Sequence, residues 1–351
     1  MYEVAIIQVS NMSTTTRSRN LSNKLNQLHR LADNGFPIPM EMWLKQQSSD
    51  QLKDLLASSV ENYFGFQPLI VAIVGLRPSK FGDDYSALVA RNRAQIDQRS
   101  PVADASIEQR TQTIRLMLQH GCDPNIRSIG TRSFISPPGL TPLYSAVRAE
   151  FAEVIPLLVE FGAYLEKSYF NNKNPLILSA RLCVFREMKV LIELGLDVDD
   201  YDDGPHSFWQ TALHLCAKHP LGHSCIKLLI ANGAYDSMYI RDRNDYLPVH
   251  LTVLGGNADS LLELINSGSP LGSIEELYDV AYDCYIEEGV ASGNKQRFLD
   301  TMGVIKWVQR RSFLCLAESC NAYNHSSNDH HDHIVKYIFD EMIIKEICSY
   351  L

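Results

Sequence analysis

Short segments with apolar residues at helical spacing recur along this chain, and most of them end at a glycine. Residues 210–237 contain two such segments, separated by a short turn with proline and glycine, both of which break helices. In the first segment Leu213 and Cys216 share one helical face. In the second segment Ile226 and Leu229 do the same. Two short helices cannot bury both apolar faces alone, so this helical hairpin needs neighbours.

The hairpin pattern returns at a nearly constant interval, which indicates a repeat protein. Helix-opening pairs occur roughly every 33 to 37 residues, at Thr141-Pro142, Asn174-Pro175, Thr211-Ala212 and Leu247-Pro248. Glycines that can end a helix in a left-handed conformation follow at similar intervals, namely Gly121, Gly162, Gly195, Gly233 and Gly268. Two independent marks therefore agree, and units of this kind bury their apolar faces by stacking on one another.

The residues of each unit resemble the ankyrin repeat, which opens with Thr-Pro-Leu-His and closes with Leu-Leu-x-x-Gly-Ala. The best matches are TALHLCA with GHSCIKLLIANGA, TPLYSAVRAEFAEVIPLLVEFGA and PLILSARLCVFREMKVLIELGLDVD. The resemblance implies an all-α ankyrin-repeat solenoid of about five stacked helix-turn-helix repeats, with divergent helical caps at both ends. An unrelated array of helical hairpins is the alternative.

This interpretation divides the chain into three regions. They are a divergent helical N-terminal cap at 1–60, ankyrin repeats at 61–272, and a degenerate repeat with a helical C-terminal cap and tail at 273–351. In the first region helical patterning starts near Leu21, and Pro37 and Pro39 are expected to impose extended backbone. A separate small domain is the alternative for this region.

The first repeat is interrupted. FQPLIVAIV (66–74) is typical of a first helix, and IRLMLQHGCDPN (114–125) of its partner. Between them, the insertion 77–106 is polar and mixed in charge, which is typical of a loop. A partner-specific or regulatory insertion is the functional alternative. Ser106 and Gln109 predict a capping box where the second helix begins.

The resemblance also implies where partners bind, because ankyrin proteins use the hairpin tips and the exposed side of each first helix. Three consecutive repeats carry a cation at one equivalent first-helix position, at Arg148, Arg181 and Lys218. Since packed helices lie about 10 Å apart, these cations would form a row that meets acidic side chains of a protein partner. An ordinary solvated helix face is the alternative explanation.

Positions in the connecting hairpins complete the predicted partner-binding surface. They carry aromatic, cationic and amide side chains, and aromatic and arginine side chains often anchor interfaces. These positions are Phe170, Lys173, Phe208, Trp209, Gln210, Arg243 and Tyr246. His214 and His250 occupy the place of the motif histidine. The resemblance implies that such histidines fix neighbouring turns by hydrogen bonds, which is a structural role and not a catalytic one.

Composition narrows the function classes. The formal net charge of −9 argues against binding to nucleic acid. The eight cysteines show no metal-binding pattern, and Cys183, Cys216 and Cys225 occupy or adjoin small apolar helix positions. We therefore expect free thiols in a reducing compartment, the cytoplasm or nucleus. The start of the chain is unlike a secretory signal, and the longest apolar run, 69–76, is far shorter than the ~20 residues of a membrane span.

The C-terminal region leaves alternatives open. Ser273 and Glu276 predict a capping box at a helix start. A helix over about 295–320 is apolar on two sides, which favours a packed cap, and a basic amphipathic target for a calmodulin-like partner is the alternative. The run 324–333 contains four histidines, which suit zinc or nickel. Its spacing is that of a linker, so we expect adventitious metal binding or none.

The last residues suggest a second functional class. EMIIKEICSYL is weakly similar to the opening helix of an F-box, although the usual proline is missing. No nucleophile–base pair, phosphate-binding loop or catalytic carboxylate pair stands out, so we predict no enzyme, cofactor or structural metal. The predicted function is a monomeric, non-catalytic scaffold that binds partner proteins on a concave ankyrin surface. The alternative is a substrate-recognition adaptor of a ubiquitin ligase.

Overall fold

The computed structural model describes most of the chain. The described residues are 12–58, 66–75, 105–129, 139–165, 174–202, 208–273, 276–281 and 299–309, with side chains from residue 21 onward. The chain divides into two compact units, Met1–Leu271 and Gly272–Leu351. Within the described ranges the secondary structure is helical, apart from an isolated antiparallel bridge between Tyr201 and Thr211.

The first unit contains helical hairpins stacked in chain order. Each hairpin joins a first helix to a second helix, and the pairs are α4 (Pro68–Val74) with α6 (Ile107–Gln119), α7 (Pro142–Arg148) with α8 (Val154–Glu160), α9 (Pro175–Leu182) with α10 (Phe185–Glu193), α11 (Ala212–Lys218) with α12 (His223–Ala231), and α13 (Pro248–Leu254) with α14 (Ala258–Asn266). A short 3-10 helix, η3 (Asp236–Met238), follows α12.

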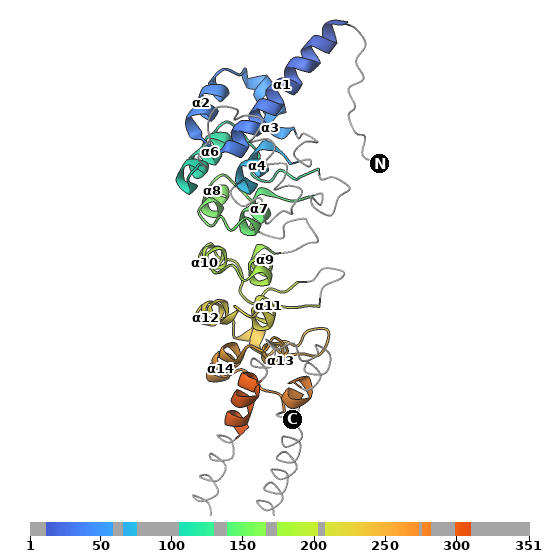
Figure 1. The fold of residues 1–351 in the computed structure, drawn as a ribbon, viewed down its shortest axis with the longest axis vertical. Coiled ribbons are helices and arrows are strands. Elements are labelled where there is room, and N and C mark those ends of the chain that lie inside the picture. Colours follow the sequence, from blue (N-terminus) through green and yellow to red (C-terminus); the bar gives the residue numbers. More distant parts are fainter. Residues whose placement is uncertain are drawn as a thin grey trace, which may run out of the picture. The chain divides into compact units, whose positions relative to one another are not determined.

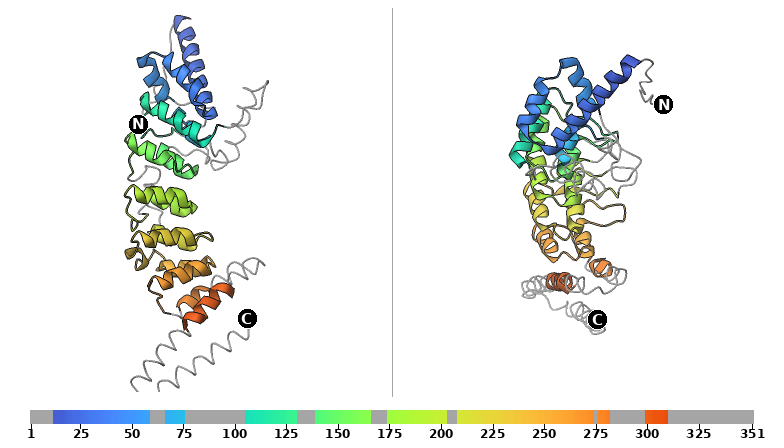
Figure 2. Two further views of the ribbon diagram at one scale, coloured as in Figure 1. Left: turned by 90° about the vertical axis from the view of Figure 1, so that its left-hand side faces the viewer. Right: turned by 45° about the horizontal axis from the view of Figure 1, so that its top comes forward.

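The hairpins form two parallel rows of helices (Figures 1 and 2). The first helices pack against one another in the order α4, α7, α9, α11, α13, and the second helices pack in the order α6, α8, α10, α12, α14. Each hairpin therefore contacts mainly the hairpins before and after it. The prediction of an all-α solenoid of stacked helix-turn-helix repeats is confirmed.

Burial explains why the first helices are so apolar. Every residue of α4 is buried, and in α7 only Arg148 is not. The second helices bury only one stripe each, such as Cys225, Ile226 and Leu229 in α12. A first helix lies between two neighbours and its own partner, whereas a second helix keeps one face in solvent.

Local signals set the helix boundaries. Tyr144 N–H donates to Thr141 Oγ1 (3.2 Å) at the start of α7. Leu176 N–H donates to the Asn174 side chain (2.7 Å) at the start of α9. Such caps satisfy backbone donors that the first helical turn leaves unpaired. The predicted capping box at Ser106 and Gln109 is present, with N···O distances of 2.9 and 3.2 Å.

The predicted helix-ending glycines all have left-handed backbone. Their φ angles lie between +84° and +95° at Gly121, Gly162, Gly195, Gly233 and Gly268. Nothing lies within 4 Å of a Cβ built at any of them. Conformation, and not lack of space, is therefore what favours glycine there.

Three further helices cover the first repeat: α1 (Met12–Asn34), α2 (Pro37–Lys45) and α3 (Ser49–Ala57). The expectation that helix starts near Leu21 is wrong, because α1 begins at Met12. Extending an existing helix costs much less free energy than nucleating a new one. The polar residues before Leu21 therefore extend α1, although they provide no apolar face. Pro37 likewise opens α2 instead of extending the chain, since proline suits the first helical turn.

A buried arginine joins these helices to the first repeat. Arg110 of α6 is 1% exposed. It donates to the carbonyl oxygens of Ala72 in α4 (3.1 Å) and Asp33 in α1 (2.6 Å). Gly35 makes room for it, because a Cβ there would lie 2.5 Å from Arg110 Cγ. One side chain thus connects three helices that are far apart in the sequence.

In the second unit the structure describes helical residues at 276–281 and 299–309. The predicted capping box is present: Glu276 N–H donates to Ser273 Oγ (3.0 Å), and Ser273 N–H donates to Glu276 Oε2 (3.3 Å). Tyr278 donates to Gln309 Oε1 (3.2 Å), which links the two helical segments. Apolar side chains such as Leu277 and Ile305 are buried.

Candidate protein-interaction surface

The segments that connect one repeat to the next, before α11 and before α13, are held together by backbone hydrogen bonds. We call them connecting hairpins, to distinguish them from the helical hairpins. Asp202 N–H donates to the Gln210 carbonyl (3.0 Å), and Asp242 N–H donates to the Tyr246 carbonyl (2.9 Å), so each hairpin closes on itself. Arg243 N–H donates to the Phe208 carbonyl (2.9 Å), which ties the second hairpin to the first. The side chains of this surface therefore stand on a connected backbone.

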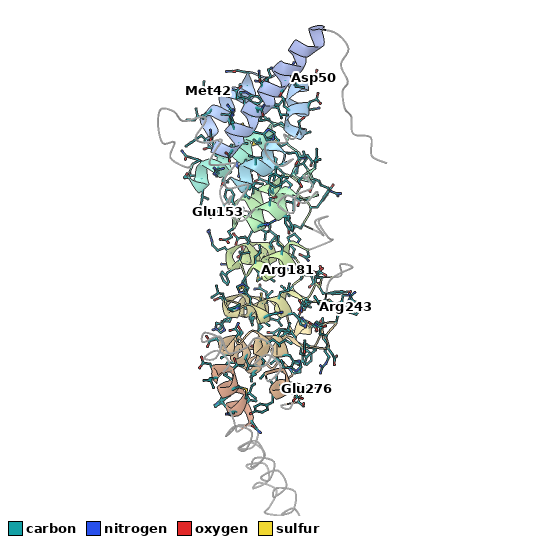
Figure 3. All side chains as sticks on the ribbon, turned by 45° about the vertical axis from the view of Figure 1, so that its right-hand side comes forward. Met42, Asp50, Glu153, Arg181, Arg243 and Glu276 are labelled. Atoms are coloured by element: carbon teal, nitrogen blue, oxygen red, sulfur yellow. The ribbon has the colours of Figure 1, made fainter. Side chains whose placement is uncertain are left out.

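Two exposed aromatic residues lie at this junction. Phe208 and Trp209 are 51% and 49% exposed. The Arg243 guanidinium lies over the Trp209 ring, 4.6 Å from its centroid, in a cation–π contact. Figure 3 shows Arg243 at the edge of the unit where these connecting segments run. We call Phe208, Trp209, Gln210, Arg243 and Tyr246 the hairpin-tip patch.

The backbone of the patch is strained at equivalent places. Trp209 has a φ of +56° and Asp245 a φ of +65°, each immediately before the last residue of a hairpin. A left-handed conformation is uncommon for a non-glycine residue, and for a bulky side chain it costs free energy. Arg241 donates to the Asp245 carbonyl (2.6 Å) and so supports the second turn.

A buried carboxylate organises the second hairpin. Asp242 is 5% exposed and accepts through Oδ1 from Asn244 N–H (2.8 Å) and Tyr246 N–H (3.1 Å). Its Oδ2 accepts from Gln210 Nε2 (2.9 Å). Gln210 is predicted to bind a partner, yet its amide nitrogen is already committed to Asp242. The sequence alone did not single out Asp242, although its place in the run DRNDY suits a turn that a side chain caps.

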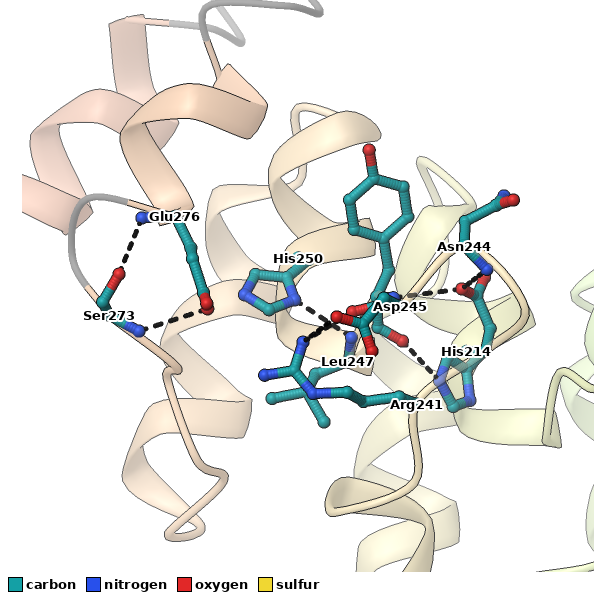
Figure 4. A network of polar contacts seen from close by, with 10 residues as sticks. His214, Arg241, Asn244, Asp245, Leu247, His250, Ser273 and Glu276 are labelled. Atoms are coloured by element: carbon teal, nitrogen blue, oxygen red, sulfur yellow. Dashed lines mark hydrogen bonds and ion pairs between the residues drawn. The ribbon is translucent and has the colours of Figure 1, made fainter.

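His214 connects the first helix of one repeat to the hairpin of the next (Figure 4). Its Nε2 lies 3.2 Å from the Tyr246 carbonyl oxygen, and its Nδ1 lies 2.9 Å from Thr211 Oγ1. Because a carbonyl only accepts, Nε2 carries the proton and Nδ1 accepts from Thr211. Burial lowers the pKa of His214 to about 4, against smaller raising effects of Asp242 and backbone carbonyls. The ring is therefore neutral at pH 7.

His250 takes the same position in the next repeat. Its Nδ1 accepts from Leu247 N–H (3.0 Å), and its ring meets Tyr246 edge-on at 6.1 Å between centroids. His214 makes the hydrogen bond to a neighbouring turn that the resemblance implied, whereas the His250 Nδ1 accepts from the residue that precedes its own helix. Neither is arranged as a catalytic base, since each lies almost wholly within the packed interior.

The row of cations is less uniform than its sequence spacing indicates. Arg181 forms an ion pair with Asp202 (3.1 Å), whose side chain is 2% exposed. Arg148 is half-buried, whereas Lys218 is exposed. Burial raises the pKa of Tyr144, and both Arg148 and Arg181 oppose this rise, which places the two cations near the same ring. Arg181 thus links α9 to the connecting segment that follows α10, while 46% of its side chain stays exposed.

Several residues predicted to be functional lie outside the described ranges. Phe170 and Lys173 fall in 166–173. The same holds for most of the insertion 77–106, for the histidine-rich run and for the F-box-like segment. Within the described ranges, no three His, Cys, Asp or Glu side chains gather as metal ligands. No helix of those ranges is long and apolar enough to cross a bilayer.

The stacked hairpins with capped first helices have the fold of an ankyrin repeat domain. Among solved structures, the human ASB11 ankyrin repeat domain matches with a TM-score of 0.51 and 17% sequence identity, over 78% of this chain and 96% of that one. At this identity the likeness concerns the fold. No protein-family model and no curated protein matches the chain.

Proposed function

We propose that the chain is a non-catalytic scaffold that binds a partner protein through the hairpin-tip patch. The observation that carries this proposal is the exposed pair Phe208 and Trp209, held on hydrogen-bonded hairpins and backed by Arg243. Large aromatic side chains that lose little freedom on binding are common energetic anchors of interfaces. A half-exposed tryptophan on strained backbone adds little to the packing of the repeats, so its position favours a binding role.

The partner that fits this surface presents acidic side chains beside an apolar group. Lys218 lies on α11, the first helix that follows Gln210 of the patch. Arg148 lies on α7 two repeats earlier, and Arg243 belongs to the patch itself. The chain as a whole is acidic, so a local group of cations would orient a partner of opposite charge. Arg181 contributes less, because Asp202 already neutralises much of its charge.

Affinity purification of the full chain, followed by calorimetry with the recovered partner, tests the proposal. The paired variant Phe208→Ala with Trp209→Ala should weaken binding at least 30-fold, since truncated anchors cost about 2 kcal/mol or more. Tyr235→Ala is the matched control, because Tyr235 is 56% exposed and lies outside the patch, immediately before η3. Equal affinity of the wild type and the paired variant would overturn the proposed surface.

Charge reversal tests the electrostatic part separately. Arg148→Glu with Lys218→Glu should reduce affinity more at low salt than at high salt. Lys189→Glu, on the second helix α10, is the control. Unchanged affinity of the double reversal at low salt would remove the acidic partner from the proposal.

The ligase adaptor is the alternative finer function, and it rests on the F-box-like segment alone. It predicts that a cullin-type ligase subunit is recovered with the chain and is lost on deletion of residues 334–351. Recovery of a partner without such a subunit, or its persistence after the deletion, would favour the plain scaffold.

A further inference from the structure

Two cysteines from neighbouring repeats form a close thiol pair beside the turns that join first to second helices, and Cys216 contacts one of them, Cys225. Cys183 Sγ and Cys225 Sγ are 3.6 Å apart. Cys183 belongs to the turn between α9 and α10, and Cys225 to the first turn of α12. Cys216 of α11 is fully buried and lies 3.9 Å from the Ala180 carbonyl. In the hairpin-tip patch, residues 208–210 precede the start of α11, whereas Cys216 lies near the end of that helix.

Cys183 occupies a backbone position that does not suit it. Its φ is +54°, and at the corresponding turn of the last repeat Gly256 has a φ of +59°. A left-handed non-glycine residue costs free energy, so glycine would serve the turn better. Cys183 Sγ also contacts the Leu221 carbonyl of the next repeat (3.2 Å). A thiol thus stands at a strained position and points across the boundary between repeats.

The two thiols of the closest pair differ in access. Cys183 is partly exposed, whereas Cys225 is 1% exposed. A small solute can therefore reach Cys183 first, and Cys225 is placed to react with it afterwards. A disulfide needs about 2.0 Å between the sulfurs, and side-chain rotation together with a small backbone shift of the turn can close the remaining gap.

We propose that Cys183 and Cys225 are a thiol-oxidation site that forms a reversible disulfide between neighbouring repeats, with glutathione disulfide as the oxidant. The Cys183 thiolate attacks one sulfur of glutathione disulfide, whose S–S bond breaks as a mixed disulfide forms. The departing glutathione takes up the proton that Cys183 lost. Cys225 then attacks Cys183 Sγ and releases the second glutathione with the second proton. Two electrons pass from the two protein thiols to glutathione disulfide.

The environment of the two thiols slows their reaction with an oxidant. The hydrogen bond to Cys225 and burial raise the pKa of the Cys183 thiol. The contact with Cys183 lowers the pKa of Cys225, but contact with Cys216 and burial outweigh this and raise it to about 12. Thiol exchange proceeds through the thiolate, so a protonated pair reacts slowly. The ratio of glutathione disulfide to glutathione then sets how much of the pair is oxidised at equilibrium.

The disulfide would join the turn after α9 to the start of α12. These segments belong to consecutive repeats, so the bond would oppose their separation. Cross-linking residues that are 42 positions apart restricts the unfolded chain, which is the usual source of stabilisation by a disulfide. Oxidation would thus stiffen the boundary between the two repeats that carry Arg181 and Trp209.

Peptide mapping tests the proposal directly. The native full chain is incubated with glutathione disulfide, its remaining thiols are alkylated, and it is digested with trypsin. The sequence places Cys183 in 182–186 (LCVFR), Cys225 in 219–227 (HPLGHSCIK) and Cys216 in a third peptide that ends at Lys218. A linked pair of the first two peptides is expected, and glutathione with a reductant should separate them again.

Variants and melting curves complete the test. Cys225→Ser should leave Cys183 as a mixed disulfide with glutathione, whereas the control Cys122→Ser should keep the link. The oxidised wild type should melt several degrees above the reduced protein, and the Cys225→Ser variant should show no such difference. Free Cys183 and Cys225 after oxidation, a link to Cys216 instead, or a link that forms only in urea would each overturn the proposal.

Discussion

Acidification should destabilise the repeat stack through His214. The ring is buried, donates to the Tyr246 carbonyl and has a folded-state pKa of about 4. The unfolded chain has the ordinary value of about 6.5. The unfolded state therefore takes up a proton first as the pH falls. Stability from this residue is complete above the unfolded pKa and is lost progressively as the pH falls toward the folded pKa.

The magnitude follows from the two pKa values. The full difference corresponds to about 3 kcal/mol of unfolding free energy. Between about pH 7 and about pH 5, where most carboxylates stay ionised, linkage gives a loss of about 2 kcal/mol. Burial also lowers the pKa values of His29 and His219, so the wild type has other contributions of the same sign. The contribution of His214 is the difference between wild type and a His214 variant.

The assay is urea unfolding followed by circular dichroism at both pH values, for the wild type and for His214→Gln. The variant should be less stable at pH 7, because it cannot keep both hydrogen bonds of the ring. Its loss of stability between the two pH values should be about 2 kcal/mol smaller than that of the wild type. If both proteins lose the same amount, the neutral buried imidazole is not the acid-sensitive group and the reasoning fails.

Three further predictions concern single contacts or backbone angles. Arg110→Met should lower the unfolding free energy by about 3 kcal/mol, because the carbonyls of Ala72 and Asp33 lose buried charged donors; an unchanged urea midpoint would contradict this. Glu150→Gly and Cys183→Gly should each raise the free energy of unfolding by about 1 kcal/mol under reducing conditions, since both residues have positive φ. Lower melting temperatures of these variants would show that the two positions are not strained. Trp209→Ala should leave the melting temperature within about 4 °C while weakening partner binding, as calorimetry would show.

The features that could be predicted from the sequence depend on neighbours along the chain. Caps such as Thr141 and the Ser106–Gln109 box act over three residues, and the glycines after the second helices act at a single backbone angle. Periodic burial then follows from the repeat itself. The prediction of extended backbone at Pro37 was wrong, because proline also suits the first turn of a helix and here opens α2.

The features that could not be predicted join distant segments. Arg110 reaches a carbonyl 77 residues away, and no local pattern marks a buried arginine. Arg181 had the spacing of an outward cation, yet Asp202 from the following hairpin pairs with it. Within the candidate surface, the partner-binding role of the residues stays a prediction, and the cation–π contact of Arg243 with Trp209 could not be predicted because it depends on how two connecting hairpins lie together.

The serial arrangement of hairpins in the first unit has a consequence for how damage spreads. Each helical hairpin contacts mainly the one before and the one after it. In the described part of this unit, no single hairpin therefore holds all the others, and the loss of one would not unfold the whole unit at once. A lesion near α13 would fray that end first, and α4 to α10 could outlast it. The first unit would therefore unfold repeat by repeat, beginning at the damaged end.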